Sequence, residues 1–271
     1  MRTFLIILTL ISTMVGLTSC TKKETNTNTK KQDEILVLCG GSMRGVLEAL
    51  KTQYAKISDD KILTTYGGSG ELCAQIENTG KGDLYLCHDP FMPWAYKKKL
   101  ISQWSTVGSL KVVIIVPKDN PKHIKTLKDL ALPNLRLGIG NQNYSTSGQI
   151  IKAILRQEPF GKDILKNVRV ETKGHQSRCN DVMMGTLDAA VVWNAVAYLY
   201  REKAQIIPIP TDKYDAITSA TYDKSELDYT KVALGIIAGK EKRKSVIKFY
   251  NFIRTQGLSV FQEYGFSPVR K

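Results

Sequence analysis

Short apolar runs alternate along most of this chain with segments in which apolar residues recur at helical spacing. Glu34 to Cys39 is the first such run, and it ends in Gly40-Gly41-Ser42. The apolar residues that follow every three or four positions are Val46, Leu47, Leu50 and Tyr54. This order predicts a strand, a glycine turn and then a helix.

The same unit recurs further along the chain. Further strands are predicted at residues 62–66, 84–86, 111–116, 135–139, 168–171, 189–193, 206–209 and 232–237. Helical spacing follows most of them, at residues 72–76, 94–100, 149–157, 179–184, 195–202 and 242–255. Strands and helices that alternate with short turns predict mostly parallel sheets flanked by helices.

The rhythm restarts after Val116, so we expect two α/β lobes with a ligand cleft between them. The predicted first lobe consists of residues 34–114 plus 211–271, and the second of residues 115–210. The runs at 111–116 and 206–209 are the expected seam between the lobes.

The first 33 residues have a different pattern. Arg2 precedes an apolar run from Phe4 to Gly16, about thirteen residues long, which is too short for a helix that spans a ~30 Å hydrocarbon core. Leu17-Thr18-Ser19-Cys20 follows and resembles the bacterial lipobox, whose cysteine accepts diacylglycerol. The alternative is an ordinary secretory signal that happens to hold a cysteine. We expect a lipoprotein signal peptide at 1–20, lipidation of Cys20, and a polar, flexible tether at 21–33.

The balance of charge is strongly basic, with a formal net charge of +14. In an exported protein this suits anionic lipid, nucleic acid or a small anion. The lysines are spread along the chain, and we find no zinc-finger spacing, RNA-binding signature or basic stripe interleaved with aromatic residues. This distribution argues against nucleic acid as a partner.

Three turns at the ends of predicted strands share one chemistry. They are Gly41-Ser42, Gly68-Ser69-Gly70 and Ser145-Thr146-Ser147-Gly148. Each offers backbone N–H groups, a hydroxyl and the positive end of a helix dipole, a combination that suits an anion. For a single turn, a serine that merely caps its helix is the simpler explanation. Three such turns in two lobes predict a cleft with donors on both walls.

An ordered set of motifs resembles a known family. The stretches are Cys39 to Gly45, Tyr66 to Leu72 with Gln75-Ile76, and Gly82 to Leu86. They resemble the first lobe of the periplasmic molybdate/tungstate-binding proteins, the substrate-binding components of ABC importers with a type II periplasmic-binding-protein fold.

The resemblance covers most of the chain and implies a function. It implies that Ser42 and Ser69 donate to a small oxyanion such as molybdate or tungstate, and it extends less closely to Ser145, Thr146, Ser147 and Asn194. It further implies an importer permease as partner, a monomer, no cofactor other than the bound anion, and a place in the periplasm or on the outer face of the cytoplasmic membrane. Trp193 stands where relatives often carry a tyrosine, and Arg44 where most carry a small or apolar residue.

Arg44 and Arg178 leave the identity of the anion open. A guanidinium offers a two-pronged donor to an oxyanion, and the alternative for each residue is a solvated arginine on a helix face. If both enter the cleft, sulfate, phosphate or a carboxylate is as good a candidate as molybdate.

The remaining cysteines are Cys39, Cys73, Cys87 and Cys179, an even number in an exported protein. We expect one disulfide, with Cys39 to Cys87 the best pairing, or else buried thiols. The alternative is a soft-metal site in which thiolates are joined by His88 or His175. No spacing between them matches a metal finger.

Catalysis finds little support in the sequence. We find no G-x-S-x-G elbow, H-E-x-x-H motif or P-loop, and His88-Asp89 with Ser69 is a poor imitation of a triad. The chain is therefore predicted to be a receptor and not an enzyme. The alternatives to an oxyanion receptor are a receptor for a metal ion or another small solute, and a pair of lobes used for signalling or surface attachment.

Overall fold

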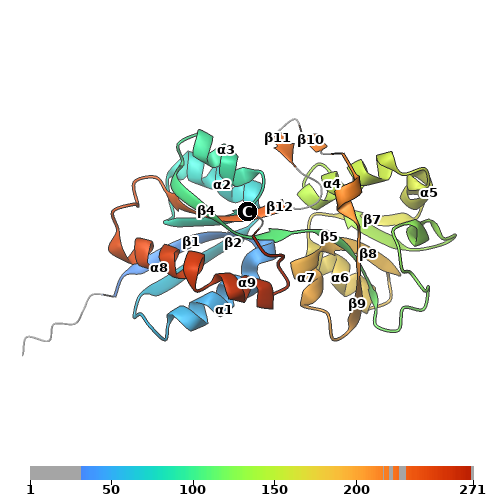
Figure 1. The fold of residues 1–271 in the computed structure, drawn as a ribbon, viewed down its shortest axis with the longest axis horizontal. Helices are drawn as coiled ribbons and strands as arrows, with labels where there is room; N and C mark the ends of the chain where they lie inside the picture. The colour runs from blue at the N-terminus through green and yellow to red at the C-terminus, as the bar shows by residue number, and fades with distance from the viewer. Residues whose placement is uncertain (1–31, 216, 220–221, 226–229, 270–271) are drawn as a thin grey trace, which may run out of the picture. The chain divides into compact units, whose positions relative to one another are not determined.

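The computed structural model describes residues 32–215, 217–219, 222–225 and 230–269 (Figure 1). The predicted signal peptide, Cys20 and nearly all of the tether lie outside the described residues. Within them, no helix is both long and apolar enough to cross a membrane.

The first sheet has five strands in the order β2-β1-β3-β12-β4. Its strands are β1 (Glu34–Gly40), β2 (Lys61–Gly67), β3 (Leu84–His88), β4 (Ile101–Leu110) and β12 (Thr230–Ile237). β1 pairs in parallel with β2 and β3, whereas β12 runs antiparallel to β3 and β4. We call this sheet with its helices the first lobe.

Helices cover both faces of the first sheet. α2 (Ser69–Thr79) and α3 (Phe91–Lys97) pack over one face, where Leu38 and Tyr85 are buried. The other face carries α1 (Arg44–Tyr54), α8 (Lys244–Thr255) and α9 (Leu258–Glu263). Because side chains alternate between the faces of a strand, each face of β1 has its own core.

The second sheet repeats this order as β7-β6-β8-β5-β9. Its strands are β5 (Val112–Pro117), β6 (Leu137–Gly140), β7 (Val168–Thr172), β8 (Ala189–Trp193) and β9 (Ala204–Pro208). Its helices are α4 (Thr146–Gln157), α5 (Gly161–Lys166), α6 (His175–Met183) and α7 (Asn194–Tyr198). β6 is parallel to β7 and β8, and β5 is antiparallel to β8 and β9. We call this group the second lobe.

Short elements complete the described chain. They are the 3-10 helices η1 (Gly41–Met43), η2 (Lys128–Ala131) and η3 (Thr211–Lys213), and the antiparallel pair β10 (Ile217–Ser219) and β11 (Tyr222–Ser225).

The predicted fold of two lobes, each a mixed sheet flanked by helices, is confirmed. In each five-stranded sheet four strands run in the same direction and one is antiparallel to both of its neighbours, so each sheet is mixed and mostly parallel, as predicted. The antiparallel strand in each sheet is the one that arrives from the other lobe along the chain, β12 in the first and β5 in the second.

The sheets also locate the crossings between the lobes. β5 pairs along its length with β8 and β9, so the first crossing lies at Lys111 and not between residues 114 and 115. At the second crossing, Lys213 and Tyr214 both bond to Glu158 of the second lobe. The second lobe therefore extends beyond residue 210.

The expected disulfide between Cys39 and Cys87 is not formed, because all four described cysteines are free and buried. Cys39 stands opposite Leu86 in the β1–β3 ladder. Cys87 is one residue further on, so its side chain points to the other face of the sheet. Among the described residues, no group of three or more His, Cys, Asp or Glu side chains could hold a metal ion.

Candidate ligand-binding site

A cavity of about 530 Å³ lies where strand ends and helix starts of both lobes meet. Its volume falls within the range of roughly 300–1,000 Å³ that is typical of small-molecule sites. The residues that line it are Gly41, Ser42, Gly67, Gly68, Ser69, Gly70, Glu71, His88, Phe91, Asn143, Tyr144, Ser145, Thr146, Gln149, Lys173, Gly174, His175, Gln176 and Trp193.

Ser69 places a buried hydroxyl on the wall of the first lobe. It begins α2, it is 5% exposed, and its hydroxyl has no hydrogen-bond partner among the described residues. The Tyr85 hydroxyl donates to the Ser69 carbonyl at 2.6 Å and fixes this end of the helix. A Cβ atom at Gly40 would lie 2.7 Å from the Ser69 hydroxyl, so glycine there keeps the hydroxyl in place. A buried hydroxyl without a partner is unfavourable, so the Ser69 hydroxyl is available for a hydrogen bond to a ligand.

The wall of the second lobe carries a different pair of hydroxyls. Ser145 and Thr146 line the cavity, and the Ser145 and Ser147 hydroxyls are hydrogen-bonded to each other at 2.9 Å. Ser147 is 1% exposed and is absent from the lining, so it positions Ser145. Gln149, one turn into α4, lines the cavity, and its buried amide oxygen has no hydrogen-bond partner in the described part of the chain.

Several helices of the described chain begin at this cavity, among them one helix of the first lobe and two of the second. α2 starts at Ser69, α4 at Thr146 and α6 at His175, and all three residues belong to the lining. The first turn of a helix has unpaired N–H groups and the positive end of the helix dipole. Three such ends directed at one cavity favour a negatively charged ligand.

Glu71 and Lys173 are the charged lining residues, and they pair with each other from opposite lobes. The Glu71 carboxylate also accepts a hydrogen bond from the Gly68 N–H at 3.0 Å. The hydrogen bond from Lys173 is the main cause that lowers the pKa of Glu71. Since the two charges cancel, a bound anion would be held mainly by neutral donors and helix ends.

Two histidines and a tryptophan form the aromatic part of the lining. The Trp193 ring at the end of β8 lies 5.8 Å from the ring of His88 and 5.7 Å from that of His175, centroid to centroid. Burial lowers the pKa of both histidines, and the nearby Arg178 charge lowers that of His175 further. Both rings are therefore neutral at pH 7.

Residues 35–267 match the model of a protein family described as bacterial extracellular solute-binding protein. The chain belongs to this family. This solute-binding protein is 23% identical over 239 residues to a binding protein of Haemophilus influenzae, across 88% of this chain and 92% of that protein. It is 21% identical over 245 residues to the molybdate-binding protein ModA of Escherichia coli, across 87% of this chain and 90% of ModA.

A solved structure supports the same fold. The sulfate-binding protein SubI of Mycobacterium tuberculosis superimposes with a TM-score of 0.70 at 16% identity, and 88% of each chain is covered. The sequence resemblance to the molybdate/tungstate-binding family and the prediction that the protein is not an enzyme are confirmed.

Of the residues predicted to bind the ligand, four line the cavity of the solute-binding protein: Ser42, Ser69, Ser145 and Thr146. Trp193, at the position expected for a tyrosine, lines it as well. Ser147, Arg44 and Asn194 do not. None of the four described cysteines lines it either, so the idea of a thiolate site in the cleft is not supported.

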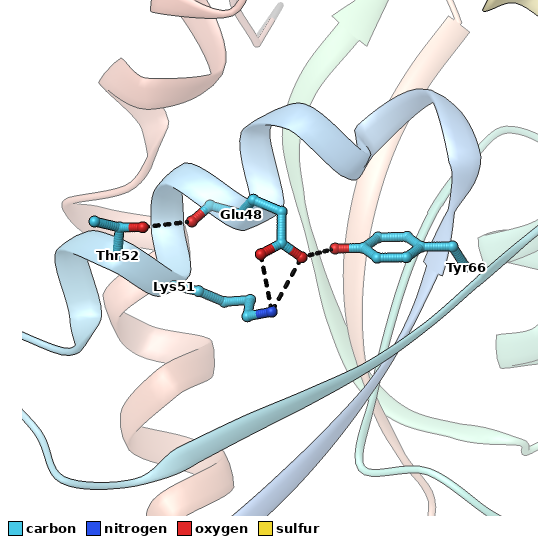
Figure 2. A network of polar contacts seen from close by, with 4 residues as sticks. All are labelled: Glu48, Lys51, Thr52 and Tyr66. Atoms are coloured by element: carbon cyan, nitrogen blue, oxygen red, sulfur yellow. Dashed lines mark hydrogen bonds and ion pairs between the residues drawn. The ribbon is translucent and has the colours of Figure 1, made fainter.

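Arg44 is exposed and covers an aromatic ring outside the cavity. Its guanidinium carbon lies 4.3 Å above the centre of the Tyr66 ring. Figure 2 shows the contacts beyond it, where the Tyr66 hydroxyl donates to the Glu48 carboxylate, which also accepts two bonds of 3.0 Å from Lys51. Arg44 therefore belongs to a surface network that anchors the end of β2.

Asn194 bonds to the junction between the lobes. Its side-chain oxygen accepts from the Lys111 N–H at 2.9 Å, and its side-chain nitrogen donates to the Gly265 carbonyl at 2.9 Å. Lys111 is the first crossing point, and Gly265 belongs to the segment after α9. With both ends of its amide engaged, Asn194 holds the junction and has no free group for a ligand.

Arg178 is neither on a solvated helix face nor in the lining, because it is fully buried. It donates to the Thr172 carbonyl at 2.7 Å and to the Thr172 hydroxyl at 3.0 Å, and its other terminal nitrogen lies 3.1 Å from His175 Nδ1. Burial lowers its pKa to about 10. Arg178 thus positions His175 from behind.

Sequence reasoning missed Gln149 and the Glu71–Lys173 pair, and it considered the two histidines only for metal or triad roles. Gln149 lies four positions after Ser145, so helical spacing places both at the same end of α4 and could have found it. Lys173 carries no such signal, because its pairing depends on how the second lobe meets α2.

Proposed function

We propose that this protein is a lipid-anchored extracytoplasmic receptor of an ABC importer that captures a small oxyanion between its two lobes. Molybdate and tungstate are the first candidates, since the curated relative ModA is a molybdate-binding protein. Ser42, Ser69, Ser145 and Thr146 are the proposed donors.

One observation carries this proposal. The unpartnered Ser69 hydroxyl stands at a cavity where α2, α4 and α6 begin, while the opposite charges of the two charged lining residues cancel each other. Such a site offers hydrogen-bond donors and the positive ends of helices, but no unpaired cationic side chain. This combination suits an anion that must later be released. A few charge-assisted hydrogen bonds at ~1.5–3 kcal/mol each are sufficient for micromolar affinity, about 8 kcal/mol.

A second candidate is another small anion such as sulfate, phosphate or a carboxylate. Lys173 supports this second candidate, because its ammonium group lines the cavity. A ligand with more negative charge than the Glu71 carboxylate would compete with Glu71 for that ammonium group. The metal-ion alternative has no such support among the described residues.

A thermal-shift panel tests the anion site. Molybdate, tungstate, sulfate and phosphate are titrated against the wild type, Ser69→Ala and Ser245→Ala. Ser245 is a matched control, because its hydroxyl is also buried and unpartnered in the first turn of a helix, yet lies outside the lining. We expect at least one anion to raise the melting temperature of the wild type and the Ser245 variant and to raise that of Ser69→Ala less. A panel without any stabilisation would contradict the proposal.

The anchor is tested separately. Cys20→Ser should move the protein from the membrane fraction to the soluble fraction after cell lysis, because no acceptor for the lipid is left. Cys73→Ser is the control and should leave the protein with the membrane. If the Cys20 variant stays with the membrane, another segment or a partner holds it there.

A further inference from the structure

The two histidines of the cavity have fixed and opposite hydrogen-bonding roles. His88 Nδ1 lies 2.7 Å from the carbonyl oxygen of Asp89. A carbonyl can only accept, so Nδ1 of the neutral ring carries the hydrogen. The second nitrogen, Nε2, is then left with a free lone pair and is an acceptor.

His175 has the reverse arrangement. Its Nδ1 lies 3.1 Å from a terminal nitrogen of Arg178 and 3.4 Å from the backbone nitrogen of Trp193. Both of these groups can only donate, so Nδ1 accepts and the hydrogen of the neutral ring sits on Nε2. His175 Nε2 is therefore a donor.

Both Nε2 atoms are free for a ligand. Both histidines line the cavity next to Trp193, and neither Nε2 has a hydrogen-bond partner among the described residues. The site thus combines one aromatic acceptor from the first lobe with one aromatic donor from the second.

We propose that His88 determines specificity by accepting a hydrogen bond from an O–H group of the ligand, while His175 and Ser69 donate to its oxyanion oxygens. This inference rests on the proposed capture of a small oxyanion, and among such anions it favours phosphate or a hydroxyl-bearing organic anion over molybdate, tungstate and sulfate. Sulfate and molybdate present only acceptor oxygens at neutral pH, so one of these oxygens would face the lone pair of His88 without a hydrogen between them. A hydroxyl removes that repulsion and adds a hydrogen bond.

The cavity is large enough for a ligand that carries other groups besides the oxyanion. At ~30 Å³ per water molecule, 530 Å³ corresponds to roughly eighteen waters. A five-atom anion fills a minor part of that space. The hydroxyl can thus belong to a protonated inorganic anion, such as hydrogenphosphate, or to a small organic substituent.

The test compares ligand pairs that differ mainly in the hydroxyl. The inorganic pair is phosphate and sulfate, and the organic pair is glycerol 3-phosphate and propyl phosphate. Affinities are measured by titration calorimetry at pH 7.5 for the wild type and His88→Phe. We expect the wild type to prefer the hydroxyl-bearing member of at least one pair by about tenfold, the usual effect of one lost hydrogen bond at a desolvated site. The pair that shows the preference identifies the source of the hydroxyl.

In His88→Phe the ring is retained and the acceptor is lost, so the preference should disappear. His123→Asn removes the third histidine, which is exposed and outside the lining, and should keep the preference. Equal affinity for both members of both pairs in the wild type would overturn the role of His88 even if the variant fails to fold, as would a preference that survives in His88→Phe. If no anion binds the wild type, the proposed function fails instead.

Discussion

The two lobes have the same strand order but offer the cavity different chemistry. Gly68-Ser69 begins α2 after β2, and Gly174-His175 begins α6 after β7. His88 ends β3 in the first lobe, where Trp193 ends β8 in the second. Equivalent positions thus carry a small donor and an acceptor on one side, and a ring donor and an apolar surface on the other.

The supports behind these residues differ as well. Arg178 follows His175 by three positions and holds its Nδ1, whereas the position three after Ser69 is the buried Leu72. Ser145 bonds to Ser147, but the Ser69 hydroxyl has no partner. The hydroxyl of Ser145 and the ring of His175 in the second lobe are therefore held by neighbouring groups, whereas the first lobe keeps one donor, the Ser69 hydroxyl, without a partner among the described residues.

Outside the site the lobes share a scaffold. Asp83 precedes β3, accepts from the Leu36 N–H at 2.8 Å and pairs with Arg243. Asp188 precedes β8, accepts from the Arg136 N–H at 2.8 Å and pairs with Arg136. Each buried aspartate ties the start of one strand to its neighbour, so the lobes differ mainly where they meet the cavity.

The largest expected effect is a difference in thiol reactivity between a cysteine of the first lobe and one of the second. Burial raises the pKa of Cys73 in the first lobe to about 11 and that of Cys179 in the second to about 12. At pH 8 the thiolate fraction of Cys179 should be about a thousandfold below that of a free thiol with a pKa of ~8.5. As the pH rises, iodoacetamide should label Cys73 before Cys179, as read by peptide mass spectrometry.

These thiols also affect stability at high pH. The unfolded chain loses its thiol protons above pH ~8.5 while the folded chain keeps them, so the free energy of unfolding should fall as the pH rises beyond that point. Protein unfolded in urea, in which every thiol is exposed, is the control for labelling. Labelling of Cys179 before Cys73 would contradict the order of the two pKa values.

The next effect concerns the support behind His175. Arg178→Ala should lower the free energy of unfolding by about 3 kcal/mol, because it leaves a cavity and removes the donors to Thr172 and His175. Arg178→Leu introduces the residue type found at the equivalent position of the first lobe, Leu72. Leucine fills more of the space than alanine, so the free energy of unfolding should fall less. Both variants should bind the ligand more weakly, since His175 is no longer held. Urea unfolding and calorimetry check this, and a Leu variant with wild-type affinity would show that His175 needs no support.

The next effect in size compares Ser69 of the first lobe with Ser145 of the second. Ser69→Ala should weaken anion binding by about tenfold and leave the stability of the ligand-free protein unchanged or raised, because the deleted hydroxyl has no partner to lose. Ser145→Ala should weaken binding less and lower stability by about 1 kcal/mol, because it leaves the buried Ser147 hydroxyl unpaired. Opposite results for the two variants would reverse the assignment of fixed and unsatisfied donors.

The sequence predicts the scaffold better than the site. Apolar runs such as Ala189 to Trp193 give buried strands, but β4 was missed because Ile101 to Leu110 is largely polar and forms an edge with β12 as its partner. The six-residue helices α5 and α9 are too short for a clear period.

Within the site, the glycine and serine turns were recognisable because their chemistry is local. The roles of Asn194 and Arg178 were not, since both depend on partners. Asn194 bonds to Lys111 and Gly265, which are far from it in the sequence, and the role of Arg178 follows from the tautomer that it fixes in His175. The register between β1 and β3 likewise explains why Cys39 and Cys87 form no disulfide. Cys39 lies opposite Leu86 and not Cys87, so the two cysteine side chains point to opposite faces of the sheet.

The smallest expected effect concerns the Glu71–Lys173 pair that joins the lobes across the cavity. Both side chains are about half exposed, at 64% and 48%, so the pair itself contributes no more than ~1 kcal/mol to closure. Lys173→Gln removes the pair and leaves the Glu71 charge beside the anion, so both effects act in the same direction and affinity should fall by about threefold at low salt. Glu71→Gln removes the pair together with the charge that repels the anion, so its affinity should change less.

Calorimetry at low and high sodium chloride should show that both differences in affinity shrink with screening. Asp163→Asn, which breaks the exposed pair with Lys166 on α5, is the control. Equal losses in the two cavity variants would mean that closure, and not the charge of the lining, sets the affinity.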